Sequence, residues 1–162
     1  MKYAIVYSSR TGNTKLLAEA IKESIPDDLC VYYGEPNDKA LQADRIYVGF
    51  WTNSGSCSEE ISEFLKTVTN QEIFLFGTAG FGSPEYYDKI IERVSAYLGP
   101  DARKIGSFMC QGKMQMSVRR RYEKMMEGKD ADPKIQSSID NFDRALSHPD
   151  EKDIADLKAA IM

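Results

Sequence analysis

The residue types best suited to chemistry in this chain stand together in one polar segment, Ser8-Ser9-Arg10-Thr11-Gly12-Asn13-Thr14. It follows an apolar stretch and precedes a helical pattern, so its hydroxyl and amide groups would meet the backbone N–H groups of a helix start. Such a set of donors binds anions, above all phosphate. Gly12 lets the backbone approach a ligand closely, and Thr14 is placed to cap the helix and donate its hydroxyl to a phosphate oxygen.

The same segment has a second interpretation, which is a capped turn between a strand and a helix that binds no ligand. Two other kinds of phosphate site are disfavoured. The segment lacks the GxxxxGK[ST] pattern of nucleoside triphosphatases and the GxGxxG pattern of dinucleotide-binding folds.

The remaining side chains offer little catalytic chemistry of their own. The chain has one histidine, His148, and three cysteines, Cys30, Cys57 and Cys110, without a CxxC motif. This set disfavours a zinc site, a disulfide framework and catalysis built on histidine, and we predict no metal. Free cysteines are usually small buried apolar residues, so we expect Cys57 and Cys110 to pack rather than to react. Any chemistry must therefore come largely from a cofactor.

Alternating strand and helix patterns must position the polar segment. Short runs rich in Val, Ile, Tyr and Phe predict five buried strands, at 3–7, 29–33, 45–50, 72–78 and 105–110. Apolar residues at helical spacing predict helices around 17–25, 61–68 and 87–98, while 38–43 fits only a turn or two. Strict alternation of strands and helices implies that parallel strands are joined by right-handed crossover connections. The predicted fold is a three-layer α/β sandwich with helices on both faces of the sheet.

Length and composition predict one cytoplasmic domain over residues 1–162. The length is close to the roughly 150 residues of a single domain, and 42% hydrophobic with 28% charged residues is typical of globular proteins. No apolar run approaches the ~18 to 20 residues of a membrane span, and no signal-peptide core follows Met1. A net charge of −4 weighs against a nucleic-acid binder, although Arg119 to Arg121 form a local basic cluster.

The run Ser9-Arg10-Thr11-Gly12-Asn13-Thr14 fits the pattern [ST]-x-T-G-x-T, and on this motif the chain resembles the flavodoxins. In that family the motif binds the phosphate of FMN. The resemblance extends over the strand and helix order to about Cys110 and implies a five-stranded parallel sheet in the order 2-1-3-4-5. FMN would lie at the carboxyl ends of the strands, beside the switch point. Ser8 to Thr14 would form the phosphate site, with Arg10 reaching the phosphate or pointing to solvent.

By the same resemblance, the loops after the third and fourth strands flank the flavin ring. The predicted cofactor-binding residues of these loops are Trp51, Thr52, Asn53, Ser54, Gly55, Thr78, Ala79, Gly80, Phe81 and Gly82. Trp51 and Phe81 would stack on the ring, and one glycine would turn its peptide toward the flavin N5 atom. A buried core position is the competing interpretation of Trp51.

Three functions are compatible with this pattern. The first is a one-electron carrier that holds FMN noncovalently and serves two protein partners, a reductase and an electron acceptor. The second is an FMN-dependent NAD(P)H:quinone-type reductase, although such enzymes tend to be longer and no second nucleotide motif is visible. The third, a binding module without flavin, conflicts with the intact phosphate motif. The carrier is preferred, although carriers of this family tend to be more acidic.

The segment from Gln111 to Gly128 is not accounted for by the resemblance. An apolar stripe at helical spacing, with Ser117 as a cap, predicts an extra helix near 113–128, and Arg119 to Arg121 would face outward. Its role has two interpretations: a cover for one sheet edge, or a docking surface for an acidic partner or an anionic substrate. Later helical patterns include a C-terminal helix near 150–161.

Overall fold

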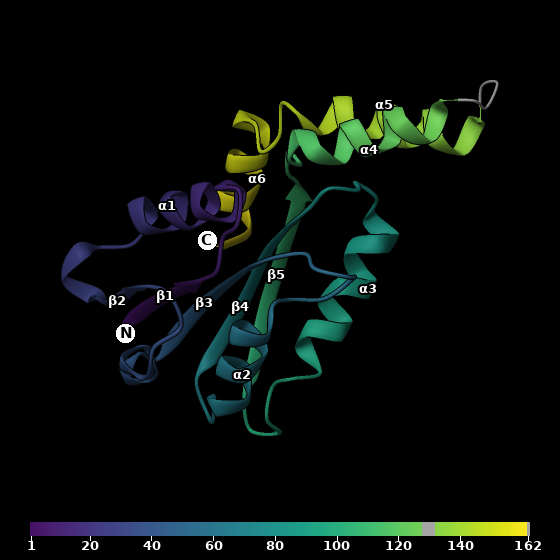
Figure 1. Ribbon diagram of the computed structural model, residues 1–162. Helices are drawn as coiled ribbons and strands as arrows, with labels where there is room; N and C mark the ends of the chain where they lie inside the picture. The colour runs from purple at the N-terminus through teal and green to yellow at the C-terminus, as the bar shows by residue number, and fades with distance from the viewer. Residues whose placement is uncertain (128–131, 162) are drawn as a thin grey trace.

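Five parallel strands form one sheet in a computed structural model that describes residues 1–127 and 132–161 (Figure 1). The strands are β1 (Tyr3–Tyr7), β2 (Cys30–Gly34), β3 (Arg45–Trp51), β4 (Glu72–Ala79) and β5 (Arg103–Gln111). Their order across the sheet is β2-β1-β3-β4-β5. The predicted fold class and sheet order are confirmed.

Helices cover both faces of the sheet (Figure 1). One face carries α1 (Asn13–Ser24) and α6 (Glu151–Ile161), and the other carries α2 (Glu59–Thr67) and α3 (Pro84–Ser95). Two short 3-10 helices, η1 (Asp27–Leu29) and η2 (Asp38–Gln42), complete the connections around β2.

Each face of the sheet has its own apolar core, because successive side chains of a strand point to opposite faces. In β1, Ile5 packs with Leu17 of α1 and Leu157 of α6. Its neighbours Ala4 and Val6 belong to the other core, which is shared with α2 and α3. These two cores fix the sheet, and the loops after its strands are free to form a site.

The strands end together at one edge. Trp51 of β3 lies opposite Thr78 of β4, and Thr78 lies opposite Cys110 of β5. The segments that follow these three strands therefore leave the sheet side by side, as expected for the carboxyl ends of parallel strands.

Two further helices, α4 (Met116–Met126) and α5 (Pro133–Ala145), lie between β5 and α6. They pack against each other across the carboxyl ends of the strands, beyond the tip of β5 (Figure 1). The buried residues of α5, including Ile139 and Phe142, belong to neither of the two sheet cores.

Two expectations for this segment are wrong. The extra helix does not cover a sheet edge, because α4 rests on α5 and none of its residues, all of them described, is buried. Ser117 is not the cap either, since α4 begins at Met116 and Gln115 holds the N-cap position. Gly128, the end of the predicted range, lies outside the described residues. Within the described chain, no helix is long and apolar enough to cross a membrane.

Candidate cofactor-binding site

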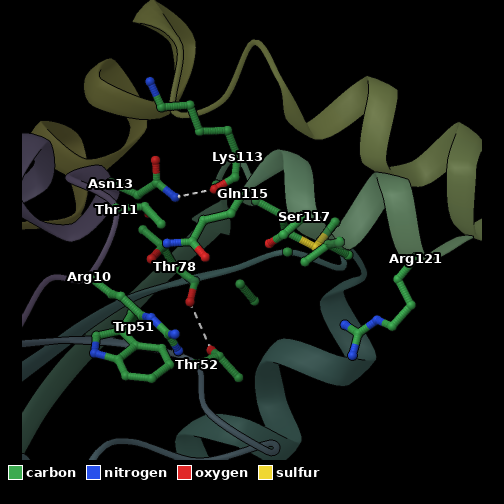
Figure 2. Close-up of a pocket in the computed structure, with 15 residues that line it drawn as sticks. Arg10, Thr11, Asn13, Trp51, Thr52, Thr78, Lys113, Gln115, Ser117 and Arg121 are labelled. Carbon is green, nitrogen blue, oxygen red and sulfur yellow. Dashed lines mark hydrogen bonds between the residues drawn. The ribbon is translucent and has the colours of Figure 1, made fainter.

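A cavity of about 350 Å³ opens at the carboxyl ends of the strands (Figure 2), a size within the range of small-molecule sites. Two parts of the chain line it. The first part belongs to the predicted site and comprises Arg10, Thr11, Asn13, Trp51, Thr52, Thr78, Ala79 and Gly80. The second part follows β5 and comprises Gly112, Lys113, Met114, Gln115, Ser117, Val118 and Arg121.

The loop before α1 turns at Gly12, which is the N-cap of the helix and has a φ of 91°. A glycine adopts this left-handed conformation without steric cost. Because Gly12 holds the cap position and α1 begins at Asn13, the predicted cap at Thr14 is wrong. Thr11, on the cavity side of the turn, borders the cavity.

The hydroxyl of Thr14 points into the protein interior. It donates to the backbone carbonyl of Phe50 at 3.1 Å and lies 3.0 Å from the hydroxyl of Thr78, and Thr14 is fully buried. In this arrangement the predicted donation from the Thr14 side chain to a phosphate is not made. Backbone N–H groups at the start of a helix are also able to donate to an anion.

The two serines of the loop hold neighbouring structure and do not border the cavity. The Ser8 hydroxyl donates to the carboxylate of Glu60. The Ser9 hydroxyl oxygen accepts the backbone N–H of Lys15 at 3.3 Å. The Ser9 contact fits the interpretation as a capped turn, whereas the Ser8 contact joins the loop to α2.

Trp51 is a residue of the cavity wall, half-buried at the end of β3. The guanidinium carbon of Arg10 lies 5.4 Å from the centre of its ring, an arrangement that gives a cation–π attraction. Arg10 is exposed and borders the cavity, with its guanidinium over the Trp51 ring. The interpretation of Trp51 as a buried core residue is wrong, because its side chain borders the cavity (Figure 2).

Phe81 does not face Trp51. With Gly82 it lines a separate hollow of about 400 Å³ between the start of α3 and α5, and Phe81 is 46% exposed. The predicted pair of rings around one cavity is therefore not formed. The sequence could not show this, because the hollow is lined in part by α5, which begins more than fifty residues further along the chain.

The loop after Trp51 folds on itself and away from the cavity. Asn53 and Ser56 exchange two backbone hydrogen bonds of 2.8 and 3.0 Å. The intervening Ser54 and Gly55 have φ values of 51° and 79°, and the carbonyl of Gly55 accepts a hydrogen bond from Arg93. Of the predicted residues in this loop, only Trp51 and Thr52 border the cavity.

Asn13 connects the two parts of the cavity wall. Its side-chain NH₂ donates to the carbonyl of Lys113 at 2.8 Å, while its Oδ1 atom is buried with no partner among the described residues. Gly112 permits this approach, because a Cβ there would lie 2.5 Å from Nδ2 of Asn13. The backbone N–H of Lys113 donates in turn to the carbonyl of His148 at 3.0 Å.

Sequence reasoning missed the residues from Gly112 to Arg121 as part of the site. The resemblance seen in the sequence ends near Cys110 and assigns none of them to the cofactor, although one interpretation of the segment is a docking surface for an acidic partner or an anionic substrate. One signal was available: the segment directly follows a parallel strand, and such segments lie at the ligand-binding edge of an open α/β sheet.

The cysteines near the site are held as thiols. Burial raises the pKa of the Cys110 thiol, and the carboxylates of Asp153 and Asp150 raise it further. Burial also raises the pKa of Cys57. Both groups stay protonated near neutral pH, which makes them poor nucleophiles.

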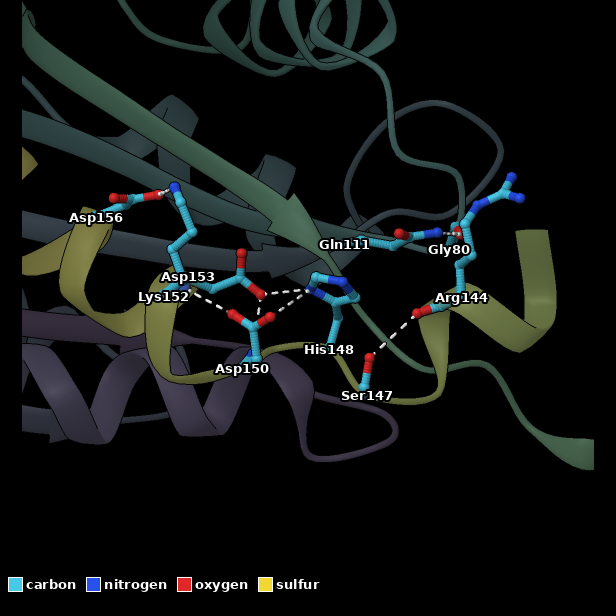
Figure 3. A network of polar contacts seen from close by, with 9 residues as sticks. All are labelled: Gly80, Gln111, Arg144, Ser147, His148, Asp150, Lys152, Asp153 and Asp156. Atoms are coloured by element: carbon cyan, nitrogen blue, oxygen red, sulfur yellow. Dashed lines mark hydrogen bonds and ion pairs between the residues drawn. The ribbon is translucent and has the colours of Figure 1, made fainter. Parts of the chain in front are cut away.

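Polar networks fix the helices beyond β5 to the strand ends (Figure 3). The side-chain NH₂ groups of Gln111 and Asn141 both donate to the carbonyl of Gly80, at 2.9 and 3.0 Å. Around the start of α6, Asp150 and Asp153 each accept the other's backbone N–H at 2.9 Å, and His148 lies 2.7 Å from the Asp153 carboxylate. These contacts account for the clustered carboxylates as helix capping.

A family model described as a flavodoxin domain matches residues 4–162. Among curated proteins, the flavodoxin-like domain-containing protein BilS of Clostridium symbiosum is 43% identical over 173 residues, covering 96% of this chain and 91% of that protein. The protein of the same name from Clostridioides difficile is 32% identical, covering 95% and 90%.

Solved structures share the fold. The two-electron reduced flavodoxin of Megasphaera elsdenii aligns with a TM-score of 0.51 and 21% identity, covering 88% of this chain and 99% of that one. A flavodoxin, WrbA-like protein from Agrobacterium tumefaciens aligns with a TM-score of 0.54 and 17% identity, covering 72% and 86%.

Proposed function

The chain belongs to the flavodoxin domain family, and from this premise we propose that it binds FMN noncovalently and carries electrons between two protein partners, a reductase and an acceptor. The observation that carries the proposal is the position of the cavity. It adjoins the [ST]-x-T-G-x-T loop at the start of α1, where the strand order reverses between β1 and β3. Cofactors of doubly wound sheets bind at such a point.

The residues present fit FMN. The orphaned Oδ1 atom of Asn13, buried in the cavity wall, is an acceptor for a hydroxyl group of the ligand. The first turn of α1 and the Thr11 hydroxyl would donate to the phosphate, while the Arg10 guanidinium lies at the Trp51 ring. Trp51 would pack against the flavin ring. Bound FMN would supply the redox chemistry, since flavins transfer one or two electrons.

The choice of a carrier rests on what the cavity wall lacks. Among the described residues that line it, the ionisable side chains are Arg10, Lys113 and Arg121, with no carboxylate, histidine or cysteine. The wall thus offers no general acid or base near neutral pH. An electron carrier needs only to bind and orient its flavin. We expect it to act in the cytoplasm, without a metal or nucleic acid.

One observation favours the second candidate, an FMN-dependent NAD(P)H:quinone-type reductase. The segment after β5 and the first turns of α4 add a wall to the cavity. Such a wall would limit the contact of a large protein with the flavin and favour a small substrate.

Flavin content and turnover test these proposals. We expect the purified protein to be yellow and to release FMN, not FAD, on denaturation. Reduction of the bound flavin by NAD(P)H should be slow until a separate reductase is supplied. Steady-state oxidation of NAD(P)H with a quinone, at about ten per second or more as in ordinary enzymes, would favour the reductase. Failure of the apoprotein to bind FMN would refute both.

A further inference from the structure

The wall built by α4 has features that FMN binding does not require. Arg121 lies three residues after Val118 and four after Ser117, so one face of α4 borders the cavity. In Figure 2 the guanidinium of Arg121 extends toward the cavity from the side opposite Trp51. The side chain of Lys113 extends away from it, which leaves Arg121 as the cation of this wall.

The charge of Arg121 is not neutralised by the protein. Arg119, two residues earlier, contacts the carboxylates of Asp143 and Glu123. Among the ion pairs of the described residues, none includes Arg121, and no acidic side chain lines the cavity. An unpaired guanidinium offers a fork of N–H donors that matches a carboxylate.

The rest of this wall is suited to a flat apolar molecule. Val118 and Met114 line it with apolar atoms, and Met114 packs so closely on Gly80 that a Cβ there would lie 2.6 Å from its sulfur atom. Methionine side chains adapt readily to the shape of a ligand. The exposed hydroxyl of Ser117 is a second donor on the same helix face as Arg121.

We propose that the α4 wall, consisting of Met114, Ser117, Val118 and Arg121, binds the carboxylate of a planar aromatic molecule beside the flavin. The position next to a flavin rests on the proposed function, whereas the anion site rests on Arg121 itself. An acidic protein would meet Arg120 as well as Arg121, since both are exposed, whereas a ligand in the cavity meets Arg121 alone. The inward direction of Arg121 favours the small molecule.

The test uses the FMN-loaded protein and two probes, anthraquinone-2-carboxylate and its neutral analogue 2-(hydroxymethyl)anthraquinone. Binding is followed by the change in the flavin absorption spectrum. We expect the carboxylate to bind at least roughly tenfold more tightly than the neutral probe, as for a hydrogen bond to a charged group. The Arg121→Gln variant should lose this preference, and the matched Arg120→Gln variant should keep it. Equal affinities for the two probes, or equal losses in both variants, would overturn the proposal.

Flavin titrations separate this inference from the proposed function. Arg121→Gln should bind FMN and riboflavin as tightly as the parent protein. A loss of affinity for FMN but not for riboflavin would assign Arg121 to the FMN phosphate and overturn the inference, while leaving FMN binding intact. If the parent protein binds no FMN, the proposed function fails. The probes can then be titrated against the fluorescence of Trp51, the single tryptophan of the chain, and the same preference is expected.

Discussion

Thr11 and Thr14 belong to one motif, yet loss of the hydroxyl should affect them in different ways. Thr14→Val removes the group that bonds to the Phe50 carbonyl at 3.1 Å and to the Thr78 hydroxyl at 3.0 Å. An unsatisfied buried polar group costs about 1 to 3 kcal/mol. In a chain of this length each kcal/mol lowers the Tm by about 2 to 4 °C. We therefore expect the Tm of the apoprotein to fall by about 2 to 12 °C, with FMN affinity nearly unchanged.

Thr11→Val should show the opposite pattern. Thr11 borders the cavity and would donate to the FMN phosphate. Loss of one hydrogen bond to a charged group costs about 1.5 to 3 kcal/mol, which raises the Kd for FMN by about 10- to 150-fold. The Tm of the apoprotein should not change, because Thr11 is not part of either apolar core.

Two measurements on each apoprotein check this contrast. Circular dichroism gives the Tm without flavin, and quenching of flavin fluorescence gives the Kd for FMN. Riboflavin, which lacks the phosphate, is the control ligand, and its Kd should be the same for Thr11→Val and the parent. If Thr14→Val weakens FMN binding as much as Thr11→Val does, at an unchanged Tm, the Thr14 hydroxyl serves the phosphate and our assignment is wrong.

Three further predictions concern other parts of the site. Trp51→Ala should increase the fluorescence of bound flavin, because a stacked indole quenches it, and should raise the semiquinone-to-hydroquinone potential, because the indole disfavours the anionic hydroquinone. Unchanged fluorescence and potential would show that the Trp51 ring does not stack on the flavin. Gly112→Ala places a Cβ 2.5 Å from Nδ2 of Asn13 and should break the hydrogen bond between Asn13 and Lys113, so this variant should bind FMN more weakly. The control is Gly99→Ala, whose Cβ lies 3.3 Å from the carbonyl of Val68 and which should bind FMN normally. Burial raises the pKa of Cys110 above the ordinary thiol value of 9.0, so the unfolded chain releases this proton first. The stabilisation that comes from the protonated Cys110 thiol is therefore present below pH 9 and lost as the pH rises above it. Between pH 8 and pH 10 the Tm of Cys110→Ala should fall less than the Tm of the parent. Equal decreases of Tm in the two proteins would contradict the raised pKa of Cys110.

The strands were predictable because local pattern determines them, and the sheet order followed from the resemblance to the flavodoxins. Runs such as Tyr3 to Tyr7 are buried on both faces of a parallel sheet and are therefore apolar throughout. The direction of the Thr14 hydroxyl was not predictable, since its partners, Phe50 and Thr78, come from two distant strands. The hollow beside Phe81 is lined in part by α5, a helix that the local pattern around Phe81 does not indicate. Contacts between residues far apart in the sequence determine the direction of the Thr14 hydroxyl and the surroundings of Phe81, and local sequence patterns do not indicate such contacts.

The independence of the two sheet cores from α4 and α5 has a consequence for how this chain can change over time. The buried residues of α5 contribute to neither core, and α4 supplies Ser117, Val118 and Arg121 to the cavity wall. Substitutions on this face of α4 therefore alter the wall without changing either sheet core. The loop before α1, in contrast, is tied to the interior through Thr14. The exposed face of α4 is thus the part of the site through which relatives with the same sheet could acquire different ligands.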